Sequence, residues 1–259
     1  MVHEAILSNV ERQESMARFV DQQQRTSIEQ LVRQFDISPA TARRDLYALV
    51  ERGQVQRVHG GARTVKQASP EAPALDRQRE QADEKRRIGT GAAALVKDGD
   101  TVFIGSGTTA LEVARALRNY RGLTVITNSL LVVNALADVP EIELISLGGQ
   151  LRRTEMSLIG HTAEHALADV RADKVILGIR AIDPEVGLTN AYLPETMTDR
   201  AILKIGREVI LVADHTKFGH VSPAFVAPIR VVHTLVTDGQ TAQSYLDAIR
   251  AQGVAIRVG

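Results

Sequence analysis

The chain has 259 residues, of which 44% are hydrophobic and 24% charged, with a formal net charge of zero and no cysteine. These values fit a soluble protein with one small and one ordinary-sized domain, and they exclude disulfides and cysteine-based zinc fingers. The sequence opens without an apolar leader and contains no run of about 18 apolar residues, so we expect no signal peptide, no membrane partner and a cytoplasmic location.

Three helices are predicted in the first fifty residues. The first continues to Gln22 with an apolar face, and the second follows Ser27, whose hydroxyl suits an N-cap. The third starts at Ser38 and Pro39, because proline lacks an N–H group that would be unpaired at the first helical position. Gly53 is expected to end this helix.

A short helix, a tight turn and a second helix that opens with small and cationic residues are typical of a helix-turn-helix. The first turns of the second helix would face the major groove, where arginine bonds guanine and threonine bonds bases or packs on a thymine methyl. A wing strand is predicted at 55–58, and residues 38–66 hold six Arg or Lys residues against two acidic ones. The alternative is a three-helix module with a solvated basic face. The candidate DNA-contacting residues are Ser27, Ser38, Pro39, Ala40, Thr41, Arg43, Arg44, Arg57, His59 and Arg63.

The stretch 38–62, SPATARRDLYALVERGQVQRVHGGA, resembles the signature of the DeoR family of transcriptional regulators. In that signature a Ser-x-x-Thr-x-Arg-Arg-Asp-Leu recognition helix runs into an Arg-Val-His-Gly-Gly-Ala wing. The family usually has isoleucine where this chain has Ala42, a difference expected to affect packing and not the face toward DNA.

A linker is predicted after this module, because residues 67–74 contain two prolines and several small residues. We therefore assign residues 8–63 to a winged helix-turn-helix DNA-binding domain, 64–80 to the linker and 81–258 to an effector-sensing α/β domain.

Short apolar runs alternate with helical patterns beyond the linker. Strands are predicted at 101–104, 123–127, 143–147, 174–178, 209–213, 231–237 and 254–258. Helices are predicted at 109–117, 130–137, 163–168, 195–205 and 242–251. Because the strands are apolar on both faces, the alternation predicts an α/β fold with a doubly wound, mostly parallel sheet, whose ligands bind at the carboxyl ends of the strands.

Polar residues and glycines follow several of these strands. Glycines and a helix start in 105–109 suit an anion, and Lys217 supplies a cation. Each of these segments, taken singly, also fits a purely structural role. Residues 105–109 could form an ordinary tight turn, residues 127–129 could cap a helix, and residues 152–153 could be a solvated surface pair. The candidate effector-binding residues are Gly105, Ser106, Gly107, Thr108, Thr109, Thr127, Asn128, Ser129, Gly148, Gly149, Arg152, Arg180, Asp214 and Lys217.

The second domain is similar to the DeoR sensor domain, because it contains the same motifs in the same order: SGTT, TNS, GG with a following arginine, LGI…GLT and ADHTKFG. The DeoR sensor domain resembles ribose-5-phosphate isomerase in fold. The resemblance implies a phosphorylated sugar or related intermediate as effector. Two positions depart from the family pattern: Gly105 replaces a frequent aspartate, and Arg180 lies where the family has Gly-Ala-Asp-Gly. Loss of an acid and gain of a cation favour a more anionic ligand.

Residues 161–165, HTAEH, match the H-x-x-E-H pattern of inverted zincins. The pattern is short and no third ligand is evident, so we expect no metal and no cofactor.

Together these patterns predict a repressor of a carbohydrate-metabolism operon, not an enzyme, that a phosphorylated sugar or related metabolite releases from operator DNA. A homo-oligomer, dimer or tetramer, would place recognition helices about 34–36 Å apart or a multiple of that distance. One alternative is an isomerase-like enzyme with an appended DNA-binding module, in which Asp214 acts as base and Lys217 as electrophile. The other is a dimerisation domain with a vestigial pocket.

Overall fold

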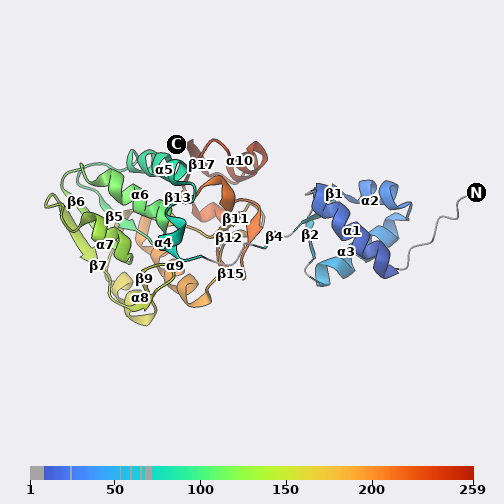
Figure 1. Cartoon of the computed structure of the whole chain (residues 1–259), viewed down its shortest axis with the longest axis horizontal. Coiled ribbons are helices and arrows are strands. Elements are labelled where there is room, and N and C mark those ends of the chain that lie inside the picture. The colour runs from blue at the N-terminus through green and yellow to red at the C-terminus, as the bar shows by residue number, and fades with distance from the viewer. Residues whose placement is uncertain (1–8, 24, 53, 59, 65, 68–71) are drawn as a thin grey trace, which may run out of the picture. The chain divides into compact units, whose positions relative to one another are not determined.

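The computed structural model describes residues 9–23, 25–52, 54–58, 60–64, 66–67 and 72–259. The chain divides between Lys66 and Gln67 into two compact units, which we call the N-terminal unit and the C-terminal unit (Figure 1). No helix in the described part of the chain has the length and apolar character needed to cross a bilayer.

The N-terminal unit combines helices with a small antiparallel sheet, in the strand order β1-β3-β2. The helix-turn-helix and the wing strand predicted from the sequence are both present. Their bounds are α1 Asn9–Gln23, β1 Arg25–Ser27, α2 Ile28–Phe35, α3 Pro39–Glu51, β2 Val55–Val58 and β3 Gly61–Thr64.

Side-chain caps explain where α2 and α3 begin. Ser27 Oγ accepts a hydrogen bond from Gln30 N at 3.2 Å, and Gln30 Oε1 accepts one from Ser27 N at 2.7 Å, which is a capping box. Ser38 Oγ accepts a hydrogen bond from Thr41 N at 3.1 Å, and Pro39 occupies the first helical position. Both predicted helix starts are confirmed, and Asp36 ends α2 in the left-handed conformation with φ +46°.

The core of the N-terminal unit joins all three helices to the sheet. Met16 from α1, Leu31 from α2 and Leu49 from α3 have no exposed surface. Buried polar contacts also orient α3 relative to α1, because Asp45 accepts hydrogen bonds from Arg12 Nε at 2.7 Å and from Gln13 Nε2 at 2.9 Å. Asp45 therefore fixes α3 against α1.

The C-terminal unit is built on a seven-stranded sheet in the order β17-β16-β13-β10-β5-β6-β7, with every neighbouring pair parallel. The predicted doubly wound sheet is thereby confirmed. The strands are β5 Thr101–Ile104, β6 Leu123–Thr127, β7 Ile142–Ser146, β10 Ala172–Gly178, β13 Gly206–Val212, β16 Thr234–Thr237 and β17 Ala255–Val258. The strand predicted at 231–237 begins later than expected, because residues Ile229–Val231 form the 3-10 helix η2.

Helices cover both faces of this sheet, because alternate residues of each strand point to opposite sides. Val102 and Ile104 pack with α5, α6 and α7, whereas Phe103 packs with α8 and α9 on the other face, and α10 covers β13 and β16 there. The helices are α4 Ala74–Arg77, α5 Ala82–Ala93, α6 Thr108–Leu117, α7 Leu130–Leu136, α8 His161–Ala168, α9 Leu193–Ile205 and α10 Gln243–Arg250.

Several short elements were not predicted, because strands of two to four residues are too short to show a period of two. A hairpin, β8–β9, and a three-stranded sheet, β11-β12-β15, extend from the main sheet. The bounds of the short elements are β4 Lys66–Gln67, β8 Gln150–Arg152, β9 Ser157–Ile159, β11 Ala181–Asp183, β12 Gly187–Asn190, η1 His215–Lys217, β14 His220–Val221 and β15 Ala224–Ala227.

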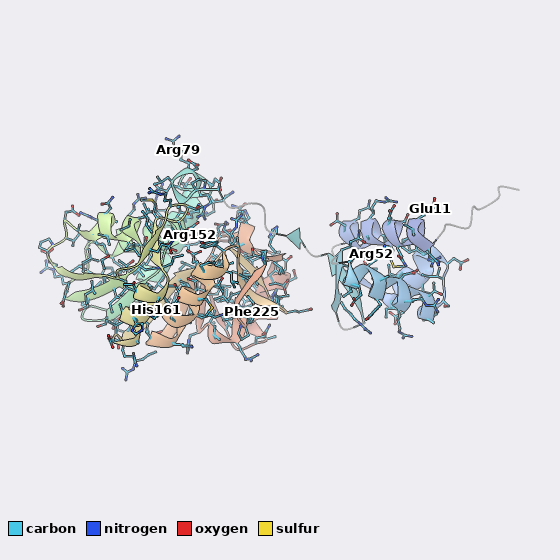
Figure 2. The ribbon with its side chains drawn as sticks, turned by 90° about the horizontal axis from the view of Figure 1, so that it is seen from below. Glu11, Arg52, Arg79, Arg152, His161 and Phe225 are labelled. Carbon is cyan, nitrogen blue, oxygen red and sulfur yellow. The ribbon has the colours of Figure 1, made fainter. Side chains whose placement is uncertain are left out.

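The end of the expected linker differs from the sequence analysis, which placed it at residue 80. Residues 74–77 form α4 and pack on the C-terminal unit. Ala74 is fully buried and its N–H donates to Thr154 O at 2.7 Å. Arg77 turns inward with 9% exposure, whereas Arg79 projects into solvent (Figure 2). The charged stretch after the prolines is therefore part of the folded unit.

Candidate functional site

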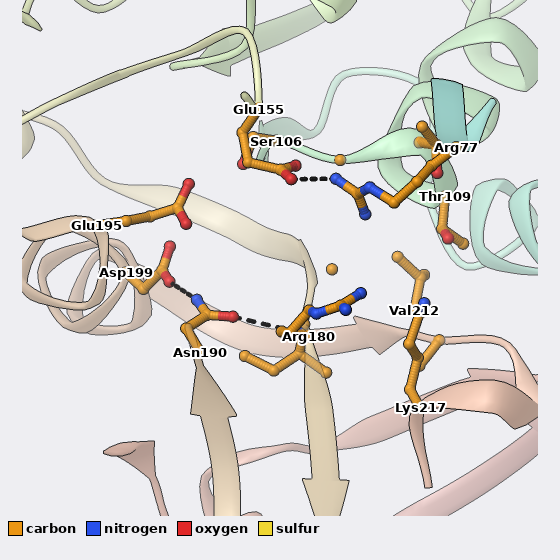
Figure 3. A pocket seen from close by; sticks show the side chains of 15 residues that line it. Arg77, Ser106, Thr109, Glu155, Arg180, Asn190, Glu195, Asp199, Val212 and Lys217 are labelled. Atoms are coloured by element: carbon orange, nitrogen blue, oxygen red, sulfur yellow. Dashed lines mark hydrogen bonds and ion pairs between the residues drawn. The ribbon is translucent and has the colours of Figure 1, made fainter. Parts of the chain in front are cut away.

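A cavity lies at the carboxyl ends of β5, β10 and β13, three neighbouring strands of the parallel sheet. Ser106 follows β5, Arg180 follows β10 and Lys217 follows β13, and all three line this space. Figure 3 shows their side chains around the same space, each on a different element. We call it the central cavity.

The loop after β5 brings a helix start to the central cavity. Gly107 has φ +100°, which favours glycine, and it is the N-cap of α6 without a side-chain hydrogen bond at that position. The first N–H groups of α6 therefore have no side-chain cap, and the positive end of the helix dipole is available to an anion. Thr108 and Thr109 add hydroxyls to the lining.

Cations converge on one side of the central cavity. Arg77 reaches it from α4 and forms an ion pair with Glu155, whose side chain is also buried. Arg180 and Lys217 complete this side (Figure 3). Cations next to a helix start are the groups that hold phosphate in proteins.

Acceptors and an amide line the opposite side. Asn190 Oδ1 accepts a hydrogen bond from Arg180 N at 3.2 Å, and Asn190 Nδ2 donates to Asp199 Oδ2. Glu195 lines the same side and pairs with Arg152, which stacks on the Tyr192 ring at 4.8 Å. Carboxylates and an amide suit the hydroxyls of a sugar, so the cavity separates anion-binding groups from hydroxyl-binding groups.

A second cavity adjoins the first. Arg77, Arg180 and Lys217 line both, and Lys85 and Asp214 are found only in the second, which we call the adjoining cavity. Asp214 is fully buried, and its Oδ2 lies 4.0 Å from Lys217 Nζ.

The charges of these cations affect one another. Burial lowers the pKa of Lys217 below its ordinary value of 10.5, Asp214 opposes this effect, and the positive charges of Arg180 and Arg77 add to it. Burial likewise lowers the pKa of Lys85. An anion placed among them would relieve this repulsion.

The third helix of the N-terminal unit has one buried and one exposed face. Ala42, Leu46 and Leu49 are buried, as the sequence predicted for this apolar stripe. Tyr47, 61% exposed, lies three and four residues after Arg44 and Arg43, so it shares their face. Sequence reasoning overlooked Tyr47, although its helical spacing from the two arginines pointed to it. Pro39, Ala40, Arg43, Arg44 and Arg57 are all exposed.

The serine and threonine hydroxyls that were predicted to contact DNA lie within hydrogen-bond distance of other groups in the protein. Ser27 and Ser38 cap α2 and α3, and Ser38 Oγ lies 2.9 Å from Thr41 Oγ1. His59 and the side chain of Arg63 lie outside the described residues.

Comparisons with known proteins agree on one family. A model described as a DeoR-like helix-turn-helix domain matches residues 12–68, and one described as a DeoR C-terminal sensor domain matches residues 80–239. The glycerol-3-phosphate regulon repressor of Escherichia coli K12 is 36% identical over 243 residues, which cover 94% of this chain and 96% of that protein. The chain belongs to the DeoR family. Similar relatives include the transcriptional repressor AccR of Agrobacterium fabrum, 37% identical over 90% of this chain and 91% of its own length. Another is the repressor GlcR of Bacillus subtilis, which is 34% identical over 96% of this chain and 95% of its own length.

Solved structures show a partial likeness. Ribose 5-phosphate isomerase A from Methanocaldococcus jannaschii matches with a TM-score of 0.40 and 19% identity over 54% of this chain and 55% of that chain. The eIF2B beta subunit from Chaetomium thermophilum matches with a TM-score of 0.44 and 16% identity over 88% of this chain and 66% of that chain.

The two departures from the DeoR pattern have different structural settings. Gly105 is buried outside the cavity lining, and a Cβ there would lie 2.7 Å from Leu177 Cδ1, so an aspartate would require Leu177 to move. Arg180 lines both cavities.

The DeoR resemblance also suggested residues that the structure does not bring to the central cavity. Thr127 Oγ1 donates to Ile104 O at 2.6 Å, and Ser129 caps α7. Asn128 pairs with Leu158 of the β8–β9 hairpin, since Leu158 N donates to Asn128 O at 2.7 Å. This unpredicted hairpin covers the end of β6.

Gly148, Gly149 and Arg152 are also absent from the described lining of both cavities. Gly149, with φ +143°, approaches the backbone of Ile159 closely and starts the hairpin. Arg152 supports the site indirectly, through its ion pair with Glu195.

Five polar residues in the described lining of the central cavity escaped sequence reasoning. Glu195 and Asp199 lie four apart on a predicted helix, so their shared face was a usable signal. Arg77 was assigned to the linker, and Glu155 and Asn190 lie beside unpredicted short strands.

The HTAEH pattern has a different arrangement from a zincin. The rings of His161 and His165 meet edge to face at 4.4 Å, and Glu164 Oε1 accepts a hydrogen bond from Thr198 Oγ1 at 3.2 Å. Within the described residues, no three His, Asp or Glu side chains are grouped to hold a metal ion.

Proposed function

We propose that this DeoR-family chain represses transcription by binding operator DNA through α3 and the wing, and that a phosphorylated sugar or related metabolite in the central cavity releases it. The family membership and the relatives named as repressors support the first part. The observation that carries the second is the cavity itself, with a helix start and cations on one side and hydroxyl-binding groups on the other.

DNA reading falls to the exposed face of α3. Arg43, Arg44 and Tyr47 project from one side of the helix, while the opposite side is fixed in the core by Leu46 and Leu49. A helix with two arginines suits bidentate contact with guanine in the major groove, and the exposed Arg57 on β2 would meet phosphate. Two copies of the chain would read the halves of a palindromic operator.

The test is the affinity of the full-length protein for its own upstream DNA at fixed salt, with and without a panel of phosphorylated sugars, polyols and sugar acids. Specific binding that one compound weakens is the expected result. Binding that every compound leaves unchanged would contradict the sensing role and favour a domain that only dimerises. Turnover of a pentose phosphate that disappears in Lys217→Met would favour the enzyme.

Arg44→Ala is expected to weaken operator binding by about 1–3 kcal/mol and to relax specificity at one base pair, because the contact with a base is lost. Anisotropy titrations with the operator and with single-base variants measure both effects. Arg18→Ala is the matched control, since Arg18 is exposed on α1 and its guanidinium bonds only the nearby Ser15 hydroxyl among the contacts described. Equal losses in the two variants would mean that Arg44 contributes charge alone.

Effector affinity is expected to fall as the pH rises through the pKa of Lys217, which burial lowers below its ordinary value of 10.5. The uncharged amine no longer attracts the anion, whereas the second ionisation of the phosphate, near pH 6, is already complete. Calorimetric titrations between pH 7 and 10 test this, and Lys217→Met should flatten the profile.

The stability of the effector-free protein should change in the opposite direction. Between the lowered pKa and the ordinary value of 10.5, the unfolded chain binds more protons at Lys217 than the folded chain does. The free energy of unfolding therefore rises with pH in this window. A decline in stability there, referenced to Lys217→Met, would contradict the assignment.

A further inference from the structure

We infer that the effector carries a second anionic group, a carboxylate with a neighbouring hydroxyl, bound in the adjoining cavity while its phosphate occupies the central one. The effector class would then be the phosphorylated sugar acids. This inference rests on the proposed function and specifies the ligand of the same site.

The first support is the distribution of charge between the two cavities. Among the described residues that line the central cavity, three cations face three carboxylates, those of Glu155, Glu195 and Asp199. In the adjoining cavity Lys85 joins the three shared cations, while Glu80 and Asp214 are the carboxylates of the described lining. The excess of positive charge therefore lies in the adjoining cavity, away from the loop at Gly107.

The second support is the position of Lys85. Lys85 is 4% exposed, and its Nζ donates hydrogen bonds to Arg77 O at 2.7 Å and to Glu80 O at 2.5 Å. These bonds to neutral carbonyls orient the ammonium group without neutralising it. Burial is the main cause that lowers the pKa of Lys85, and the charges of Lys217 and Arg77 lower it further, whereas Asp214 opposes them. A second anion beside this ammonium would offset more of the cost of its burial.

The third support is an unused acceptor. Asp214 is fully buried, and its Oδ1 accepts a hydrogen bond from Thr216 N at 3.0 Å. Its Oδ2 is buried, has no hydrogen-bond partner among the described residues and lies 4.0 Å from Lys217 Nζ. Buried carboxylate oxygens are normally satisfied, so a ligand donor is expected here. A hydroxyl supplies that donor, and a carboxylate beside it meets the cations.

Matched pairs of ligands isolate the second anion. Each pair differs only in a carboxylate or a hydroxymethyl group at the end remote from phosphate: 3-phosphoglycerate and glycerol 3-phosphate, 5-phosphoribonate and ribitol 5-phosphate, 6-phosphogluconate and glucitol 6-phosphate. Affinities of the full-length protein are measured by calorimetry, and release is measured on operator DNA. We expect the acid of at least one pair to bind about tenfold or more tightly than its polyol, the effect of one charge-assisted hydrogen bond.

Two further comparisons place the effect in the adjoining cavity. Removing the hydroxyl beside the carboxylate, as in 2-deoxy-6-phosphogluconate for the six-carbon pair, should reduce the affinity of the preferred acid. Arg180→Gln should move the acid-to-polyol ratio toward one, whereas Arg153→Gln should preserve it, because Arg153 is exposed and absent from both linings. Thermal unfolding of each variant verifies that it is folded.

The outcomes separate the two proposals. Polyol phosphates that bind as tightly as the acids and release the operator would overturn the inference and leave the proposed function standing. A preference for acids that survives Arg180→Gln would also overturn it. If no compound of either set binds or releases the operator, both the inference and the proposed effector class fail.

Discussion

A Gly61→Ala variant is expected to lose specific operator binding. A Cβ at residue 61 would lie 2.0 Å from Thr26 O and 2.8 Å from Ser27 Cα, closer than real contacts allow. Both atoms belong to the backbone of β1, which pairs with β3 through Ser27 and Gly61. No side-chain rotation relieves the clash, so the wing must separate from the strand that leads into α2.

The size of this effect follows from the small core of the N-terminal unit. Overpacking costs about 1–3 kcal/mol and occasionally more, and a domain of about sixty residues has little stability to lose. Operator binding should become too weak to measure, and the thermal transition of this unit should disappear or shift strongly to lower temperature.

The neighbouring glycine provides the control. Gly60 has φ +81°, and an added Cβ would meet no atom within 4 Å. Gly60→Asn should therefore retain operator affinity within a few-fold, since asparagine tolerates the left-handed conformation. Wild-type affinity in Gly61→Ala would contradict the β1–β3 register described here.

Lys217→Met is expected to abolish release while leaving operator binding intact. Lys217 contributes to both cavities, and its charge lies beside the buried Asp214. Lys217 would form a buried ion pair with the phosphate of the effector. Removing one partner of such a pair costs about 2–5 kcal/mol, equivalent to a loss of effector affinity of about 30- to 5000-fold. The repressor would remain bound at effector concentrations that release the wild type.

Titration of the protein–operator complex with the most effective compound of the panel measures this directly. Lys204→Met is the matched control, because Lys204 is exposed near the end of α9 and outside both linings. Release at the wild-type concentration in Lys217→Met would remove Lys217 from the effector site.

The sequence predicted those features that local chemistry determines. Ser27 and Ser38 mark helix starts because a side-chain acceptor satisfies unpaired N–H groups, and this signal needs no distant contact. The inner parallel strands were visible because their residues are apolar on both faces. The loop at Gly107 and the cation at Lys217 followed from the rule that ligands bind at the carboxyl ends of such strands.

The remaining lining residues depend on contacts that span the chain. Arg77 and Glu155 are 78 residues apart, and nothing near either one in the sequence indicates the other. The β8–β9 hairpin has strands of three residues, yet it decides that Asn128 faces Leu158 instead of the cavity. Parallel sheets define where a site lies, while short irregular segments select which side chains enter it.

If an effector binds as proposed, the segment 72–80 would connect its binding to the path of the backbone. This stretch follows the N-terminal unit in the sequence, and it supplies Arg77 and Glu80 to the cavity walls while Lys85 holds its carbonyls. A ligand that competes with Glu155 for Arg77 must change the free energy of that stretch. Such coupling is reciprocal: if the effector weakens operator binding by some factor, the operator weakens effector binding by the same factor. The sensitivity of the switch to effector would then depend on how much DNA the protein occupies.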